Sequence, residues 1–300
     1  MVPTWQAVAL QPREPNVPEL PEVETVRRGL EQQVSGFVVA RVEVLRARAV
    51  ASPPLPELFC SALEGCTVRQ WLRRGKYLMA SLERGGEPAG HWGVHLRMTG
   101  QFLWMQTPAD PCRHTRIRIW NPEGQELRFV DLRSFGEMWW VPPGEPLDSV
   151  MTGLRRLGPE PFSAEFSPQH LASKLAGSSR PIKTALLDQA LVAGVGNIYA
   201  DESLFISRIA PHTPSGALKP EQLERLHQAL VEVLQASIGA GGTTFSDFRD
   251  LTGTNGNYGN AAWVYRRGGQ PCRVCGTPIR RDKLSGRSSH WCPSCQAAEG

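Results

Sequence analysis

Four cysteines near the C-terminus restrict the fold of this chain more than any other feature of its sequence. Cys272 and Cys275 form one Cys-x-x-Cys pair, and Cys292 and Cys295 form a second pair after sixteen intervening residues. Each pair places two thiolates on one tight turn, and two such turns complete a tetrahedral zinc site with no position open to water. Such a zinc ion is structural, and it supplies folding free energy, on the order of 10 kcal/mol in zinc-finger peptides. We expect a two-stranded ribbon between the pairs; a redox pair of cysteines is the alternative.

Basic residues are concentrated around these cysteines, although the net charge of the whole chain is only +4. Between Arg266 and Trp291 there are six arginines and one lysine against a single acid, Asp282. A local patch of this kind is the electrostatic footprint expected for phosphate binding, whereas the alternative is a solvated charged surface. A basic zinc ribbon alone therefore predicts a binding module and not an enzyme.

The chain ahead of the ribbon changes from a β-like to a helical pattern. Pro21 suits the first turn of a helix that begins just after Glu19, runs for about twelve residues and carries an apolar stripe up to Leu30. Residues 37–141 contain short alternating runs separated by Gly and Pro, which is typical of an antiparallel sandwich or barrel. Residues 167–238 have helical periodicity, and Pro220 opens a strongly amphipathic helix.

The remaining cysteines and the lengths of the apolar runs indicate the cellular compartment in which the protein is expected. No apolar run approaches the ~20 residues that span a bilayer, and the first seventeen residues do not have the pattern of a secretory signal. The scattered cysteines fit a reducing compartment better than a disulfide framework, and the sequence assigns them no role; they are Cys60, Cys66 and Cys112. We expect a cytoplasmic protein with no membrane partner.

The start of the first predicted helix, PELPE from Pro18, combines two prolines with two acids. If Pro18 is the N-terminus of the mature chain, its secondary amine can attack a sugar carbon and form an iminium directly. An α-amine titrates at about 7.7–8.0, so a useful share is neutral near pH 7. Glu19 can then protonate the ring oxygen or relay protons as the sugar opens. The alternative is that both acids only stabilise the positive end of the helix dipole.

A second helix start follows the glycine-rich segment Gly194-Val195-Gly196-Asn197. The glycines permit close approach and positive φ, and Asn197 is a good N-cap for the helix after it. Such a helix start can hold a phosphate, although an ordinary helix hairpin gives the same pattern.

In combination, these segments resemble the formamidopyrimidine-DNA glycosylase family over nearly all of residues 18–296. The matching segments, in chain order, are PELPEVETVRRGL, RRGKYL, HLRMTG, DLRSFG, GVGNIYADESLF, GGTTFSDF and the cysteine segment. The resemblance implies an α+β multidomain fold. Its parts are an extension (1–17), a catalytic helix with an antiparallel β-sandwich (18–148), a helix–two-turn–helix domain with a lesion loop (149–265) and a four-cysteine zinc finger (266–300).

The resemblance also implies a function in base excision repair. A member of this family removes oxidised purines, such as 8-oxoguanine and formamidopyrimidines, and then cuts the abasic strand by β,δ-elimination through a proline Schiff base. The implied partner is double-stranded DNA that contains a damaged base or an abasic site. The implied cofactor is one structural Zn²⁺, and we expect a monomer associated with the nucleoid.

Roles for individual residues follow from the same resemblance. Pro18 is the implied nucleophile and Glu19 its acid/base partner. Phosphate contacts are implied for Lys76, Asn197, Arg287, His95 and Lys183. The residues that fill the gap left by the extruded base are implied to be Met98, Arg133 and Phe135, of which the arginine faces the orphaned cytosine. Residues 255–260 are implied to belong to the loop that covers the flipped base.

One departure from the family pattern affects the chemistry directly. Seventeen residues precede Pro18, and a proline nitrogen inside a chain is a tertiary amide without a basic lone pair. We expect a misassigned start, in which a GTG codon for Val17 initiates translation and the resulting Met is removed. A smaller departure is Leu132, which stands where the family usually has proline.

Two alternative functions remain open at this point. One is an endonuclease VIII-like glycosylase for oxidised pyrimidines, which shares the nucleophile; Met98, Arg133 and Phe135 favour the purine branch. The other is a catalytically silent zinc-finger protein that binds DNA, which a blocked Pro18 would produce.

Overall fold

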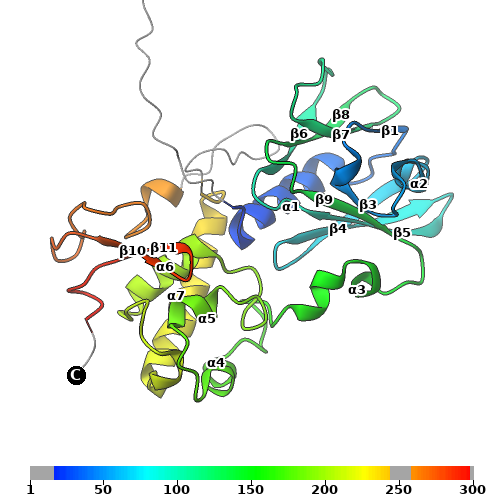
Figure 1. Cartoon of the computed structure of the whole chain (residues 1–300). Coiled ribbons are helices and arrows are strands. Elements are labelled where there is room, and N and C mark those ends of the chain that lie inside the picture. Colours follow the sequence, from blue (N-terminus) through cyan, green and yellow to red (C-terminus); the bar gives the residue numbers. More distant parts are fainter. Residues whose placement is uncertain (1–16, 244–257, 298–300) are drawn as a thin grey trace, which may run out of the picture.

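The computed structural model describes residues 17–243 and 258–297 of the chain. A β-rich half, a helical half and a small C-terminal ribbon follow one another along the sequence (Figure 1). This architecture confirms the predicted α+β fold with a β-sandwich, a helical region and a cysteine ribbon. The helices are α1 (Leu20–Val34), η1 (Ala47–Ala49), α2 (Pro56–Leu63), α3 (Leu147–Val150), η2 (Thr152–Arg156), α4 (Pro168–Leu175), α5 (Ile182–Leu186), α6 (Asn197–Ile206), η3 (Ser215–Ala217), α7 (Pro220–Gly239) and η4 (Tyr258–Asn260).

The first helix begins where the sequence predicts it and is longer than expected. Helix α1 starts at Leu20 and has 15 residues, ending at Val34. Val34 extends the predicted apolar stripe by a further turn, and it is buried together with Val26 and Leu30. Because that stripe packs on the β-sandwich, tertiary contact continues the helix past the segment that its start signals identify.

Two sheets make up the N-terminal half, with strand orders β2-β9-β5-β4-β3 and β1-β7-β8-β6. Among the described strands, β2 pairs with β9 in parallel and the other pairs are antiparallel. The strands are β1 (Arg41–Val44), β2 (Val50–Ser52), β3 (Thr67–Arg74), β4 (Tyr77–Arg84), β5 (Glu87–His95), β6 (Gly100–Met105), β7 (Thr115–Trp120), β8 (Glu126–Asp131) and β9 (Glu137–Val141).

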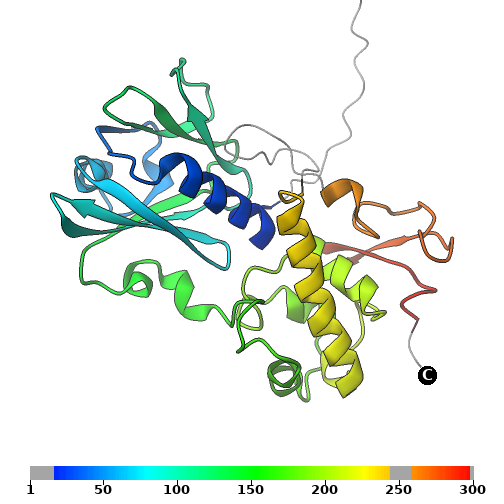
Figure 2. The same cartoon turned by 180° about the vertical axis from the view of Figure 1, so that it is seen from behind.

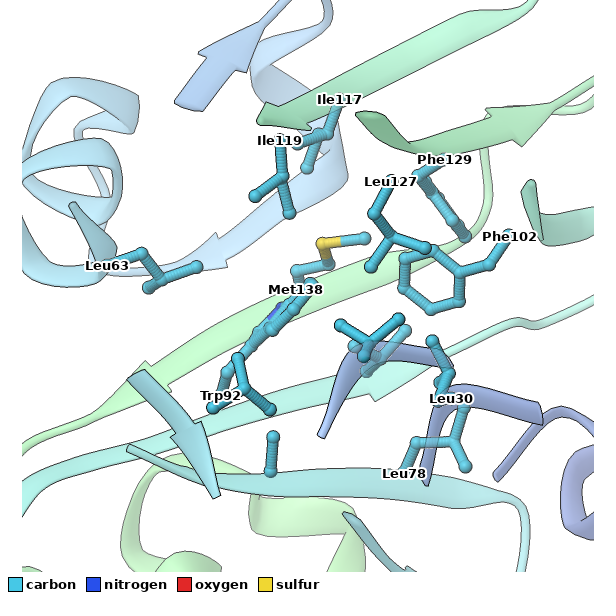
Figure 3. Packing of buried hydrophobic residues seen from close by; sticks show 14 of the residues in the cluster. Leu30, Leu63, Leu78, Trp92, Phe102, Ile117, Ile119, Leu127, Phe129 and Met138 are labelled. Carbon is cyan, nitrogen blue, oxygen red and sulfur yellow. The ribbon is translucent and has the colours of Figure 1, made fainter. Parts of the chain in front are cut away.

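The core of this half lies between the two sheets (Figure 3). Trp92 and Met138 of one sheet face Ile119 and Leu127 of the other, and Leu30 of α1 closes one end. Burial of such side chains stabilises by about 1.5–3 kcal/mol each. The sandwich is therefore a rigid body from whose loops functional side chains project.

The helical half has its own core, formed mainly by α4 to α7. Helix α7 has 20 residues and buries one face, which includes Leu226, Leu230 and Leu234. The N-terminal end of α1 points toward the C-terminal end of α7 (Figure 2). The described part of the chain contains no helix with the length and apolarity that a membrane span requires.

The C-terminal ribbon consists of β10 (Arg280–Leu284) and β11 (Arg287–Trp291), paired antiparallel as predicted. Ser285 and Gly286 connect the strands with φ values of 47° and 81°. Two consecutive residues with positive φ form the tight hairpin turn that suits the twist of paired strands. This turn places Arg287 at the start of β11, at the edge of the cavity described next.

Candidate active site between the two halves

A cavity of about 920 Å³ separates the β-sandwich from the helical half and the ribbon. Pro18 is buried at its edge, between Val17 and Glu19, which both line it. The cavity brings together most of the predicted site residues, from six separate segments; its lining includes Glu19, Lys76, His95, Met98, Phe135, Asn197 and Arg287. Pro18, Arg133 and Lys183 are the predicted site residues that are not among the residues lining it.

Glu19 immediately precedes α1, yet its side chain caps a different helix. Its Oε1 accepts a hydrogen bond from the backbone N–H of Ile198 at 2.9 Å, and its Oε2 one from Tyr199 at 3.4 Å. These donors belong to the first turn of α6, where the helix dipole favours a negative charge. The carboxyl is 2% exposed. Burial raises the pKa of Glu19, against the opposing effects of Lys76 and of these N–H groups. A raised pKa increases the protonated share of this carboxyl group, which favours a role as proton donor.

The glycine-rich segment before α6 makes this approach possible. A Cβ at Gly196 would lie 2.3 Å from Cδ of Glu19, and a Cβ at Gly194 would lie 2.7 Å from Cβ of Leu20. Gly194 also has φ of +86°, and its carbonyl accepts the Leu20 N–H at 3.1 Å. The two glycines therefore hold the start of α1 against α6.

Glu22 links the same region to α7 and is 2% exposed. Its Oε2 accepts the N–H of Glu19 at 2.9 Å, while Oε1 accepts the hydroxyl of Tyr199 at 2.5 Å and the N–H of Thr243 at 2.8 Å. The Tyr199 hydroxyl contacts Ser237 of α7 at 2.6 Å. Burial and the neighbouring Glu19 raise the pKa of Glu22 to about 7.

Lys76 lies on the turn between β3 and β4, beside an acid from the segment between η2 and α4. Glu160 accepts hydrogen bonds from Arg73 at 2.7 Å, Arg74 at 3.0 Å and the N–H of Gly75 at 2.5 Å. These contacts fix the turn that projects Lys76 into the cavity. Burial lowers the pKa of Lys76, and the attraction of nearby acids partly offsets this effect.

His95 ends β5 and is 9% exposed. Burial lowers its pKa to about 3, aided by the positive charges of Arg97 and Lys76, so the ring is neutral at pH 7. Its Nδ1 accepts the N–H of Arg97 at 2.9 Å. In the neutral ring this contact assigns the proton to Nε2, which makes that nitrogen a hydrogen-bond donor.

The three residues predicted to fill a vacated base position lie on two neighbouring loops of the sandwich. Met98 is partly exposed on the loop between β5 and β6. Arg133 and Phe135 are exposed on the loop between β8 and β9, and the Arg133 guanidinium lies 5.1 Å from the ring centroid of Phe135. Arg48 of η1 lies 5.9 Å from the same centroid and donates to the carbonyl of Ser134 at 3.0 Å.

Asn197 and Lys183 both contact the ribbon, in different surroundings. Asn197 begins α6 in the cavity wall and donates to the Ser288 hydroxyl at 3.3 Å. Lys183 is 1% exposed, with its ammonium 2.7 Å from Asp201 and bonded to the Ser288 carbonyl. Asp201 also accepts the N–H of His290 at 2.9 Å. These contacts fix the ribbon to α5 and α6, and the predicted phosphate contact of Lys183 stays a prediction.

The four ribbon cysteines have the geometry of a zinc site. Their sulfur atoms all lie within 4.8 Å of one another; Cys272 and Cys295 are 3.9 Å apart, and Cys275 and Cys292 are 3.5 Å apart. These distances are far longer than an S–S bond of about 2.05 Å. They are close to the edge of about 3.8 Å that a tetrahedron with Zn–S bonds of about 2.3 Å requires. The site therefore fits one structural Zn²⁺.

Sequence reasoning missed several residues that line the cavity, among them Arg48 and Tyr265. Neither belongs to a short motif with a defined spacing, and each reaches the cavity only through tertiary packing. Residues 255–257 of the predicted loop lie outside the described residues.

Comparison with known families assigns three consecutive parts of the chain. Residues 17–138 match the formamidopyrimidine-DNA glycosylase N-terminal domain, and residues 157–249 match the H2TH domain of the same enzymes. Residues 269–298 match a zinc finger found in FPG and IleRS, which confirms the predicted structural zinc.

Individual relatives align along almost the whole chain. A formamidopyrimidine-DNA glycosylase of Parasynechococcus marenigrum is 68% identical over 280 residues, covering 93% of this chain and 100% of the relative. One of Acaryochloris marina is 57% identical over 281 residues, covering 93% of this chain and 99% of the relative. Among solved structures, a Lactococcus lactis FPG mutant in complex with Fapy-dG containing DNA has a TM-score of 0.85 and 33% identity, over 93% of this chain and 100% of that one.

Proposed function

The chain belongs to the formamidopyrimidine-DNA glycosylase family, and from this premise we propose that it removes oxidised purines from duplex DNA and cuts the abasic strand through Pro18. The observation that supports the proposal most strongly is the position of Pro18 and Glu19. The proline lies at the edge of a cavity of about 920 Å³, and the carboxyl beside it is buried against the start of α6.

The chemistry begins at the nitrogen of Pro18. Its lone pair bonds to C1′ of the damaged nucleotide as the bond from C1′ to the base breaks, and the base leaves with that electron pair. The nitrogen then loses its proton. The C1′–O4′ bond opens as the nitrogen forms an iminium, and O4′ takes a proton from Glu19.

The iminium makes the protons on C2′ acidic, and strand cleavage follows from their loss. Elimination breaks the bond to the 3′ phosphate first, and a second elimination breaks the bond to the 5′ phosphate. The strand then has a one-nucleotide gap. The zinc ion takes no part in these steps, because all four of its positions are filled by thiolates.

DNA recognition in this proposal uses the residues around the cavity. Lys76 and Arg287 supply positive charge to phosphates, while His95 and Asn197 supply neutral hydrogen-bond donors. Extrusion of a base costs a few kcal/mol, which phosphate contacts and wedge insertion offset. The wedge residues are Met98, Arg133 and Phe135. Solved relatives in complex with Fapy-dG, abasic-site and carbocyclic 8-oxo-G DNA support the proposed class of substrate.

The lyase step requires a free nitrogen on Pro18, so we propose that the active chain begins there and lacks residues 1–17. The N-terminal family match, which begins at residue 17, supports this start. N-terminal sequencing of the native protein tests it: a chain that begins at Met1 or Val2 would contradict it.

Borohydride trapping tests the catalytic proposal. A protein that begins at Pro18 is expected to become covalently linked to 8-oxoguanine duplex under reduction, whereas one that keeps residues 1–17 is not. The same assay with thymine glycol distinguishes purine from pyrimidine preference; a solved relative in complex with oxidised pyrimidine DNA makes this comparison necessary. If the protein that begins at Pro18 binds lesion DNA and forms no adduct, the chain is a silent DNA-binding protein.

A further inference from the structure

A buried acid, Asp131, lies between the two loops that present Met98 and Phe135. It is the last residue of β8 and pairs with Gly100 at the start of β6. Its exposed fraction is 0%. A carboxyl group buried this completely is stable only when its oxygens accept hydrogen bonds. The partners that it has here belong to both loops.

The loop between β5 and β6 reaches Asp131 through Thr99. The Thr99 hydroxyl donates a hydrogen bond to Oδ1 of Asp131. The same hydroxyl accepts the backbone N–H of Arg133 from the other loop at 3.0 Å. Met98 immediately precedes Thr99, so this contact fixes the backbone from which the Met98 side chain projects.

The loop between β8 and β9 folds back onto the same carboxyl group. Oδ1 of Asp131 accepts the N–H of Arg133 at 3.1 Å, and Oδ2 accepts the N–H of Gly136 at 2.7 Å. These two hydrogen bonds enclose Ser134, which has φ of 55°, and Phe135. Left-handed backbone at a non-glycine residue is unfavourable and persists only where surrounding contacts hold it.

The ring of Phe129 leaves the two loops little room to shift. A Cβ at Gly100 would lie 2.8 Å from Cζ of this ring, and a Cβ at Gly136 would lie 2.5 Å from the same atom. Phe129 is fully buried in the sandwich core (Figure 3). Both loops are therefore packed against one rigid ring and bonded to one carboxyl group.

We propose that Asp131 is a positioning residue that holds the two loops in a fixed relative placement, so that Met98, Arg133 and Phe135 enter DNA together. This inference rests on the proposed function, in which these side chains occupy the space of the extruded base. Asp131 contacts no DNA itself. Preorganisation of this kind matters because a displacement of about 1 Å can reduce a rate on the order of 100-fold.

Two substitutions test the inference in the protein that begins at Pro18. Asp131→Asn replaces one acceptor oxygen by an NH₂ group, which cannot accept the N–H that it faces. Thr99→Val keeps the shape of the side chain and removes the hydroxyl between the loops. Single-turnover excision of 8-oxoguanine from duplex DNA is expected to fall about 10- to 100-fold in both variants. The fluorescence rise of a 2-aminopurine beside the lesion, which reports unstacking, is expected to slow in parallel.

The controls separate positioning from a general loss of structure. Borohydride trapping on a single-stranded abasic oligonucleotide needs no wedge insertion, so both variants are expected to retain it within about twofold. Thr99→Ser restores the hydroxyl and is expected to restore duplex excision. Thr115→Val, a matched change at a buried threonine of β7, is expected to behave as wild type.

The outcomes are distinct. Undiminished duplex excision in both variants overturns the inference, as does an equal loss of duplex excision and single-strand trapping in Thr99→Val. If Asp131→Asn does not fold, Thr99→Val decides alone. If the unsubstituted protein forms no adduct with either substrate, the proposed function fails, and the inference fails with it.

Discussion

Glu19 and Glu22 lie three residues apart at the start of α1, and burial acts on both carboxyl groups. Glu19 accepts N–H groups of α6 and lines the cavity, whereas Glu22 faces away from it and joins Tyr199 and Thr243. In the proposed mechanism, the first exchanges protons with the sugar. The second holds the backbone N–H of the first, so the two acids have separate tasks.

The raised pKa of Glu22 predicts a specific dependence of stability on pH. Its value in the folded protein is about 7, against 4.5 for the free side chain. A folded pKa above the unfolded one means that stability from this group is fully present below pH 4.5 and is lost as pH rises to 7. The difference corresponds to about 3 kcal/mol. In urea unfolding, the free energy of wild type relative to Glu22→Gln is expected to fall by this order between pH 4.5 and 7.

Two outcomes bear on this prediction. The Glu123→Gln variant, at an exposed acid on the turn between β7 and β8, is expected to show the pH slope of wild type, which checks that loss of one acid does not by itself change the slope. Parallel pH curves for wild type and Glu22→Gln would contradict the prediction, because Glu22 would then titrate alike in the folded and unfolded chains.

At the level of single residues, the sequence predicted the chemistry of a side chain better than its surroundings in the fold. The thiolates of the ribbon follow from residue type and spacing alone, and the chemistry proposed for Pro18 follows from its secondary amine. The burial of Lys183 does not, because the sequence shows neither Asp201 beside it nor the ribbon carbonyl that it binds. Arg48 reaches the loop of Phe135 across 87 residues of chain, a contact that only tertiary packing creates.

At the level of helices and strands, the sequence again predicted local features better than contacts between distant segments. Pro21 and the stripe of α1 predict a helix and its start, since both are local signals. Neither predicts that the acid preceding α1 would cap α6, which begins 178 residues later. That contact depends on the close approach of two segments. The glycines before α6 indicated such an approach, but the sequence did not identify the segment that approaches them.

Substitution of Gly196 tests this contact between elements. Its φ of −136° is open to any residue, so Gly196→Ala strains no backbone at that position. The added Cβ, however, would lie 2.6 Å from Oε1 of Glu19, which must therefore move. Single-turnover excision is expected to fall by about tenfold or more. Because both changes act through one carboxyl group, Gly196→Ala combined with Glu19→Gln is expected to be little worse than Glu19→Gln alone.

The matched control for this test is Gly239→Ala at the end of α7. A Cβ there meets no atom within 4 Å, so activity is expected to remain that of wild type. Full additivity of Gly196→Ala and Glu19→Gln would show that the glycine acts on something other than the carboxyl group, and would contradict the assignment.

At the scale of the whole molecule, three sets of contacts align the two halves around the cavity. Glu19 joins the sandwich half to α6, Glu160 joins the segment between η2 and α4 to the turn of Lys76, and Lys183 joins the helices to the ribbon. Each is a buried or partly buried polar contact between segments far apart in sequence. The order of the domains was predictable from motifs along the chain, whereas these contacts, which set the shape of the cavity, were not.

Removal of zinc tests whether the ribbon needs its metal to fold. It also tests whether the rest of the molecule needs the folded ribbon. The apolar cluster of the ribbon is small, and two of its buried members are the zinc ligands Cys272 and Cys292. Without the metal these thiols lose their common partner, so the ribbon is expected to unfold. The sandwich and the α4–α7 core have separate clusters and are expected to stay folded. Circular dichroism after chelation should therefore change little.

DNA binding, by contrast, should respond strongly to the same treatment. Arg287 and Ser288 lie at the start of β11, and unfolding withdraws both from the cavity wall. Loss of a charge-assisted phosphate contact, at about 1.5–3 kcal/mol, weakens binding about 10- to 100-fold. Cys292→Ser is expected to reproduce the effect of chelation, while Cys112→Ser, at an exposed cysteine outside the ribbon, is not. Zinc added back should restore the DNA affinity of the chelated wild type but not that of Cys292→Ser. Unchanged DNA affinity in the metal-free protein would mean that the ribbon keeps its fold through its contacts with α6.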